Sequence, residues 1–257
     1  MMNTHQSAPT ANRLREAILG EHDLRSNVGA LKPITVGVRK MVVHRDYNSL
    51  TFENDIGILE LASEVPYYPH IYPICLPPPQ VDYTGQIGLV SGWGKLTHGG
   101  RAPNLLQYVA LPIISNSECQ KWFFQAGKIK EIIPTFMCAG FKDGGQDSCE
   151  KLCYAQIPYL LEKEETTIGC LEVNYSGSST ESSYLGDSGG PLMIKDRTGK
   201  WTLGGIVSHG IKCAAPNLPG TLKYDLVECT NKLSFEGPIG LVSLIPAHLM
   251  LRVMNLN

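Results

Sequence analysis

The residues best suited to chemistry in this sequence form one short segment, Gly186-Asp187-Ser188-Gly189-Gly190-Pro191. Glycine allows tight turns and close backbone approach, so a serine between glycines can expose its hydroxyl and its backbone N–H to a bound carbonyl group. A nucleophilic serine needs this arrangement, because its attack creates an oxyanion that N–H donors must stabilise. The segment therefore predicts Ser188 as a nucleophile.

The composition of the chain favours a single β-rich domain. Its 257 residues and its apolar content are enough for a sizeable core. The 26 glycines and 17 prolines, together with short runs rich in valine and isoleucine, favour many short strands joined by turns. The formal net charge of −2 gives no reason to expect nucleic acid or an anionic membrane as a partner.

Eight cysteines indicate an oxidising compartment and disulfide bonds. The closest pair, Cys149 and Cys153, is not followed by a matching second pair, so no zinc site is predicted. Residues 1–20 contain no uninterrupted apolar run of the kind found in signal peptides, and the apolar stretch 239–254 is too short to span a bilayer. We expect an incomplete form of an extracellular protein rather than a cytosolic one.

Local patterns predict the elements that must position the serine. Period-two alternation and β-branched residues predict strands at 34–38, 41–44, 54–61, 87–94 and 106–114. The prolines of 73–79 require an extended connector. A short helix is expected at 115–124, with Ser115 or Asn116 as its N-cap.

The segment around Ser188 resembles the active-serine motif of the trypsin/chymotrypsin-like serine endopeptidases (the peptidase S1 family). Further segments stand in the family's order: 20–24, 54–56, 73–77, 90–94, 137–140, 147–149 and 204–220. The segments Gly-Glu-His-Asp-Leu (20–24) and Pro-Ile-Cys-Leu-Pro (73–77) are most similar to those of arthropod proteases of the clip-domain type. The resemblance implies an all-β fold of two six-stranded antiparallel barrels, with the active site in the cleft between them.

The resemblance also implies roles for the cysteines. Cys119 and Cys138 match one family disulfide, and Cys149 and Cys213 match the disulfide that braces the specificity pocket. Cys75 matches a cysteine that usually bonds an N-terminal light chain, which this sequence does not contain.

For the chemistry, the resemblance implies that Asp55 is the triad carboxylate that holds a histidine in the right tautomer, a role described for this family's own members. Taken alone, Asp55 could equally be a cap at the start of a strand. Gly186 and Ser188 would supply the N–H groups of the oxyanion hole.

The specificity pocket is expected to be trypsin-like. Asp147 matches the carboxylate at its base, which would favour substrates with Arg or Lys before the scissile bond. Gly210 and Gly220 match the two small residues of its walls. Without these matches, the surroundings of Asp147 would indicate a solvated loop residue.

The general base and the activation device are incomplete in the sequence. His5 is the one upstream histidine that could match the family's Thr-Ala-Ala-His-Cys segment; otherwise it is a terminal residue with no role. His22 and His44 match surface positions, and His209 stands where the family usually has an aromatic residue lining the substrate cleft. Asp187 matches the aspartate that pairs with a freed N-terminus, but this chain begins Met-Met, so a zymogen-like state is expected.

The expected domain is a peptidase S1 domain over 1–220, incomplete at its N-terminus, followed by a divergent tail over 221–257. An insertion at 150–185 interrupts it, either as a genuine surface loop or as a gene-model artefact. We expect the first barrel to be truncated, the C-terminal helix to be missing, and the second barrel to lose part of its closing strand and expose an edge.

The predicted function is that of a secreted serine endopeptidase that cleaves proteins after Arg or Lys through an acyl-enzyme on Ser188. No cofactor or metal is predicted, and neither nucleic acid nor membrane is expected as a partner. We expect the chain as written to be inactive rather than active. The alternative is a non-catalytic homologue that binds partners in an extracellular proteolytic cascade; retention of Ser188, Asp55 and Asp147 argues against it.

Overall fold

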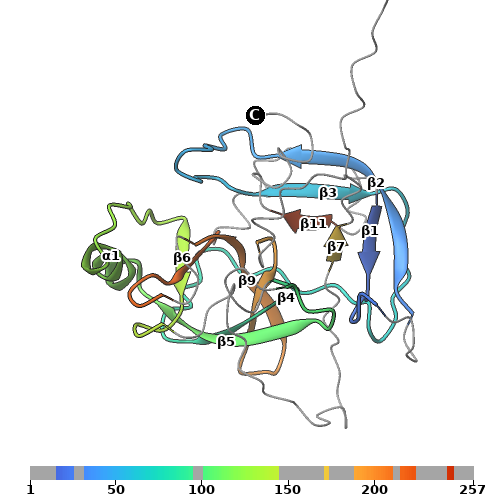
Figure 1. Ribbon diagram of the computed structural model, residues 1–257. Helices are drawn as coiled ribbons and strands as arrows, with labels where there is room; N and C mark the ends of the chain where they lie inside the picture. Colours follow the sequence, from blue (N-terminus) through green and yellow to red (C-terminus); the bar gives the residue numbers. More distant parts are fainter. Residues whose placement is uncertain are drawn as a thin grey trace, which may run out of the picture.

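A sheet and a closed barrel make up the computed structural model, which describes residues 16–25, 32–94, 101–144, 171–173, 188–210, 215–223 and 242–245. For 171–173 and 242–245 it describes the backbone. Figure 1 shows the sheet beside the barrel, with helix α1 on the side of the barrel away from the sheet. Within these ranges, no helix is long and apolar enough to cross a membrane.

The sheet has five antiparallel strands in the order β11-β3-β2-β1-β7. Its strands are β1 (Glu16–Leu19), β2 (Ile34–Val43), β3 (Gly57–Leu61), β7 (Leu171–Val173) and β11 (Val242–Ile245). The two outer strands come from regions that the sequence analysis set apart, β7 from the insertion and β11 from the tail. In the described residues this half of the molecule is an open sheet, consistent with a truncated first barrel.

The barrel has six strands and closes in the order β10-β6-β5-β4-β8-β9. The strands are β4 (Ile87–Gly92), β5 (Gln107–Ile114), β6 (Phe136–Ala139), β8 (Pro191–Lys195), β9 (Trp201–His209) and β10 (Gly220–Lys223). The expectation of an exposed edge here is wrong. The four residues of β10 pair with β6 on one side and β9 on the other, which is enough to close the ring.

The predicted alternation of strand residues produces the core of the barrel. In β5, Val109, Leu111 and Ile113 are buried, whereas the residues between them are less so. Successive side chains of a strand point to opposite faces, so this face fills the barrel interior. The sheet has a separate buried cluster, made of Ala17, Leu19, Val36, Leu61, Val65 and Ile71.

A third cluster joins the two halves. Ile56, which lies just before β3, packs against Leu203 and Ile206 of β9, with Ile74 against them. The extended connector lies along the same strand, because the Leu203 N–H donates to the Cys75 carbonyl at 2.8 Å. The residue before Ile56 is therefore held at the junction between sheet and barrel.

The predicted helix is present as α1 (Asn116–Gln125). Ser115 is its N-cap, with its hydroxyl accepting from the Glu118 N–H at 3.2 Å. The buried residues Cys119, Trp122 and Phe123 recur at the spacing of one helix face, and this face packs on the barrel.

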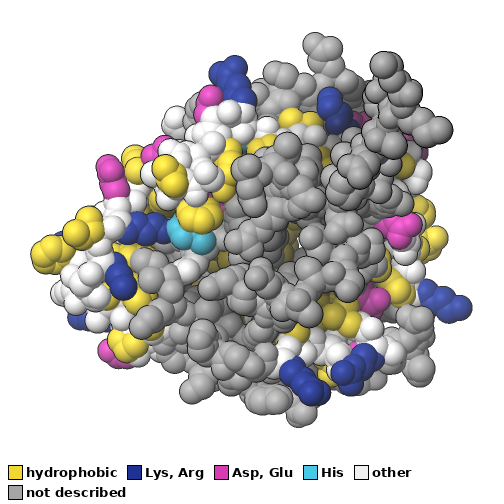
Figure 2. Space-filling view, turned by 45° about the horizontal axis from the view of Figure 1, so that its top comes forward, with side chains coloured by type: hydrophobic (Ala, Val, Ile, Leu, Met, Phe, Trp, Pro, Cys, Tyr) yellow, Lys and Arg dark blue, Asp and Glu magenta, His cyan; other side chains and the backbone are white. Residues whose placement is uncertain are grey.

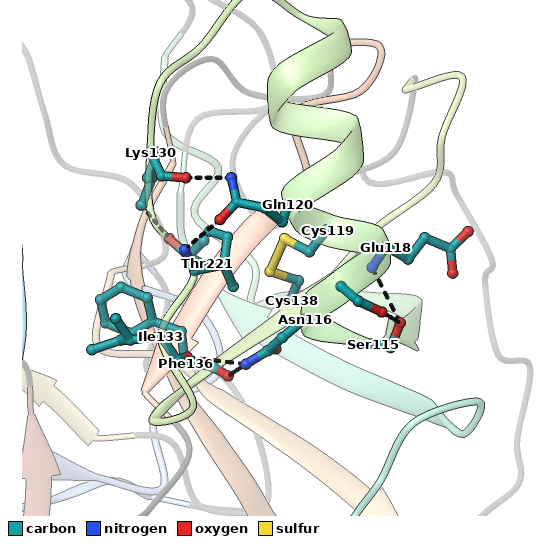
Figure 3. The surroundings of a disulfide bond; sticks show 12 residues. Ser115, Asn116, Glu118, Cys119, Gln120, Lys130, Ile133, Phe136, Cys138 and Thr221 are labelled. Carbon is teal, nitrogen blue, oxygen red and sulfur yellow. Dashed lines mark hydrogen bonds between the residues drawn. A yellow bond between two sulfur atoms is a disulfide. The ribbon is translucent and has the colours of Figure 1, made fainter.

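A disulfide between Cys119 and Cys138 fastens α1 to β6, as the resemblance predicted (Figure 3). Both cysteines are fully buried, and their Cα atoms are 6.2 Å apart. Cys149 and Cys213 lie outside the described residues. Cys75 is a free thiol and is partly exposed.

We expect the double variant Cys119→Ala/Cys138→Ala to lose about 3 kcal/mol of unfolding free energy, because the bond closes a short loop and thereby restricts the unfolded chain. The sequence separation of the two cysteines is 19 residues. Urea denaturation followed by circular dichroism measures the loss. Cys75→Ala, which removes a free and partly exposed thiol, is the matched control and should leave the midpoint unchanged; an unchanged midpoint in the double variant would contradict the assignment.

Candidate active site

Asp55 is a fully buried carboxylate at the junction of the two halves. The Ser208 hydroxyl donates to its Oδ2 atom at 2.5 Å, and Ser208 is itself 1% exposed. Burying a charge is costly unless hydrogen bonds compensate for the lost water. Since Asp55 precedes β3 and Ser208 lies in β9, this hydrogen bond links the sheet to the barrel.

Ser188 contacts the backbone of the same residue, Ser208. Its hydroxyl donates to the Ser208 carbonyl oxygen at 3.3 Å. The backbone after it is fixed to β9, because Gly189 N–H donates to the Val207 carbonyl at 2.8 Å and Val207 N–H donates to the Gly190 carbonyl at 3.0 Å. Gly189 has φ +94°, a conformation that side chains disfavour, which accounts for a glycine directly after the serine.

Ser208 thus connects the two residues that the sequence analysis predicted as nucleophile and triad carboxylate, and it was not itself predicted. The signal was present in the sequence: Ser208 follows Ile206 and Val207 in a strand whose interior is apolar. A polar side chain in such a run is expected to have a hydrogen-bonding partner.

His209, the next residue, extends this hydrogen-bonded line. Its Nδ1 atom is 3.0 Å from the Ser208 hydroxyl, and its Nε2 atom contacts the Lys130 ammonium. Because Ser208 donates to Asp55, the network assigns the imidazole proton to Nδ1 and leaves Nε2 as the acceptor for Lys130. The imidazole ring is stacked on the ring of Phe52, with the two centroids 4.3 Å apart. The backbone carbonyl of His209 accepts a hydrogen bond from the Thr221 hydroxyl at 2.5 Å.

A cavity of about 370 Å³ opens beside His209. Phe52, Ile133 and Phe136 contribute aromatic and aliphatic walls. The other lining residues are Leu50, Thr51, Glu53, Ile129, Lys130, Glu131 and His209. Figure 2 shows, on one face, a histidine side chain among hydrophobic and basic side chains.

Lys130 was not predicted as a site residue. Burial lowers the pKa of Lys130 to about 8. Its ammonium lies 5.6 Å from the ring centroids of both Phe123 and Phe136, and it donates to the Thr221 hydroxyl at 3.3 Å. Nothing in the local sequence distinguishes it from a surface lysine after a helix, so tertiary structure alone reveals it.

The two predicted pocket-wall glycines lie on neighbouring strands. Thr221 pairs with His209, and Gly220 and Gly210 are the next residues beyond that pair. A Cβ atom added at Gly210 would meet no atom of the described residues within 4 Å. The other predicted site residues, His5, Asp147, Gly186 and Asp187, lie outside the described residues.

The two other histidines considered in the sequence, His22 and His44, differ in their surroundings. His22 is exposed, as expected, but His44 is buried, so the expectation of a surface position for it is wrong. Its Nδ1 atom accepts from the Asp46 N–H at 3.2 Å and its own N–H donates to the Ile56 carbonyl, so it closes the turn that precedes β3. In the described part of the chain, no group of three or more His, Cys, Asp or Glu side chains could hold a metal ion.

Comparison with known proteins identifies the family. The trypsin family model matches residues 6–150 and 160–224, which is most of the chain. The chain therefore belongs to the trypsin family of serine proteases.

The similar proteins are proteases of arthropods and vertebrates. Serine protease filzig of Drosophila melanogaster is 41% identical over 204 residues, and serine proteinase stubble of the same organism is 38% identical over 202 residues. Each alignment covers 79% of this chain, but the chain spans 10% and 21% of these two relatives. Trypsin-1 of Astacus astacus is 32% identical over 205 residues, covering 80% of this chain and 68% of that protein.

We expect Ser208→Ala to lower the unfolding free energy by about 2 kcal/mol, because it removes a hydroxyl that donates to a buried carboxylate. Urea denaturation measures the change. Thr198→Ala is a matched control: Thr198 also donates a hydroxyl to a carboxylate, Asp196, at 2.6 Å, but on the exposed surface. The control should leave stability unchanged within error, and equal effects of the two variants would contradict a special role for the buried bond.

Proposed function

We propose that this chain is a serine endopeptidase of trypsin-like specificity, with Ser188 as the nucleophile. The observation that carries the proposal is the line from buried Asp55 through Ser208 to Ser188, across the junction of sheet and barrel, in a chain of the trypsin family. Several relatives are named as serine proteases or proclotting enzyme, which supports a protein substrate.

In the proposed mechanism, the Ser188 oxygen attacks the carbonyl carbon of the scissile peptide bond while its proton passes to a histidine base. The N–H groups of Gly186 and Ser188 stabilise the resulting oxyanion, and the amine leaves with the proton. Water then hydrolyses the acyl-enzyme and regenerates the serine. Asp55 would orient the base, and His5 is the candidate for that role.

The proposed specificity is for Arg or Lys before the scissile bond. Asp147 would pair with the substrate cation, and Gly210 and Gly220 would leave room for its long side chain. The lack of any described atom within 4 Å of a Cβ atom placed at Gly210 supports this assignment.

The proposed setting is extracellular, as expected from the cysteines and the family. The proposed domain covers 1–220, with an insertion at 150–185 and a tail at 221–257; the family match covers 6–150 and 160–224, so it leaves out only the first part of the proposed insertion and reaches a few residues into the proposed tail. The partly exposed thiol of Cys75 is available to bond a separate light chain, and Asp187 would take part in activation.

Labelling of the purified chain with a fluorophosphonate probe tests the proposal. An active protease predicts labelling of the wild-type chain and none of Ser188→Ala, because the probe reacts only with a serine whose hydroxyl is activated, whereas the inactive, zymogen-like form predicts labelling of neither. His5→Ala should reduce the labelling rate by at least about a hundredfold if His5 is the base.

Three outcomes would count against the proposal or a part of it. No labelling of a sample shown by circular dichroism to be folded would contradict an active protease and favour the non-catalytic homologue. Labelling together with cleavage of peptides that lack Arg and Lys would keep the protease and reject trypsin-like specificity. A labelling rate unchanged in His5→Ala would reject that residue alone.

A further inference from the structure

The cavity beside His209 contains a positive charge that no described carboxylate neutralises. The ion pairs among the described residues are Arg39 with Glu60 and Arg45 with Asp46, and Lys130 belongs to neither. Its contacts there are with His209, Thr221 and two phenylalanine rings. A partly buried ammonium with uncharged neighbours is favourably placed to bind an anion.

Lys130 is also held in place by α1. The Gln120 side-chain amide donates to the Lys130 carbonyl at 2.6 Å and accepts from the Ile132 N–H at 2.8 Å. Figure 3 shows Gln120 between the helix and this segment, with the Lys130 side chain directed toward Thr221. The backbone on both sides of Lys130 is therefore fixed before any ligand arrives, which lowers the entropic cost of binding.

Of the three N–H donors of the Lys130 ammonium, two face acceptors in the described residues. A lysine ammonium has three N–H donors. One faces the Thr221 hydroxyl, whose own proton goes to the His209 carbonyl, and a second faces His209 Nε2. In the described surroundings, the third N–H has no acceptor, and a ligand carboxylate could supply one.

Two acidic residues also line the cavity, and their charges must be weighed. Glu131 is exposed and Glu53 is partly exposed, and neither lies within ion-pair distance of Lys130. Charges near solvent are strongly screened, whereas Lys130 lies against aromatic rings where the effective dielectric constant is lower. The inner wall of the cavity is thus dominated by the ammonium.

The cavity lies next to the hydrogen-bonded residues Asp55, Ser208 and Ser188. His209 lines it, and the adjacent Ser208 accepts the hydrogen bond of Ser188. Adjacent strand residues are about 3.3 Å apart, so a peptide bound at Ser188 would pass the mouth of the cavity within a few of its own residues. The volume suffices for one side chain of such a peptide.

We propose that this cavity is a specificity subsite for an acidic side chain of the peptide substrate, with Lys130 as the specificity-determining residue and His209 as its positioning partner. The inference rests on the proposed function, since it assumes that a peptide occupies the cleft at Ser188. The subsite would select substrates that carry an acidic side chain in addition to the Arg or Lys before the scissile bond.

Binding to the full Ser188→Ala chain tests this without requiring catalysis. The probes are fluorescent alanine-based peptides with one arginine, in which Glu, Gln or Lys is placed in turn at each position before the arginine. Fluorescence anisotropy should give a Kd about tenfold lower for Glu than for Gln at one position, as a charge-assisted hydrogen bond allows.

The variants assign the preference to one residue. Lys130→Met, which keeps an aliphatic stem, should abolish the preference, whereas Lys130→Arg should retain it. Lys121→Met removes an exposed lysine of α1 and is the matched control. It should leave the tenfold ratio intact, and circular dichroism verifies that each variant is folded.

The pH dependence provides an independent reading. Burial lowers the pKa of Lys130 to about 8, so the ammonium form predominates below that pH and is lost above it. Glutamate stays ionised throughout, so the preference for Glu should be nearly full at about pH 7, where an ordinary histidine is mostly neutral, and largely lost at about pH 10. In Lys130→Arg it should persist at both values, because arginine keeps its charge.

Each other result overturns the inference in a different way. Equal binding of the Glu and Gln peptides, tighter binding of the Lys peptide, or a preference that survives Lys130→Met rejects the acidic subsite while leaving the protease proposal intact. Failure of every peptide to bind the folded Ser188→Ala chain rejects the subsite as well, and the absence of fluorophosphonate labelling in wild type then shows that the proposed function fails with it.

Discussion

The hydrogen bond from Ser208 to the buried Asp55 carboxylate is the interaction on which this arrangement depends. The sheet and the barrel each have their own core, so apolar packing within each half does not determine how the two halves meet. Among the described residues, the junction has a small cluster around Ile56, backbone hydrogen bonds such as that from the Leu203 N–H to the Cys75 carbonyl, and this buried hydroxyl–carboxylate bond. A buried charge tolerates few geometries, because its donors must stay aligned. The hydrogen bond therefore helps to fix the orientation of the sheet relative to the barrel, which apolar packing alone would specify less closely.

The two halves differ in how they complete their strands. The barrel closes with residues that the family model matches, and its last strand, β10, pairs with both β6 and β9. The sheet instead pairs β1 with β7 from the insertion and β3 with β11 from the tail. An edge strand leaves a row of backbone donors and acceptors unpaired, and any segment able to adopt extended conformation can satisfy them. β11 lies beyond the segment that the family model matches and still obtains a structural role in the sheet.

The sequence was sufficient for the features that depend on local pattern or on motif. The alternation in 106–114 predicted β5, the polar pair Ser115 and Asn116 predicted the start of α1, and the family resemblance predicted the Cys119–Cys138 bond. It was insufficient where distant residues meet. Lys130 and His209 are separated by 79 positions, and no local pattern indicates that they touch. The closure of the barrel by β10 was also missed, since four residues give too short a pattern to recognise without their partners.

His209 links the buried carboxylate of Asp55 to the cavity at Lys130, because its ring contacts both Ser208 and Lys130. An imidazole has two nitrogens, so unlike an aromatic hydrocarbon ring it can hydrogen-bond in two directions while stacking on Phe52. Here one nitrogen faces Ser208 and the other faces Lys130. The orientation of Ser208 is fixed by Asp55, which in turn fixes the tautomer of His209 and makes its Nε2 atom an acceptor. Protonation of this ring would place a cation against the Lys130 ammonium and would remove the acceptor. The cavity and the buried carboxylate are therefore not independent, and a substitution in one changes the hydrogen bonds available to the other.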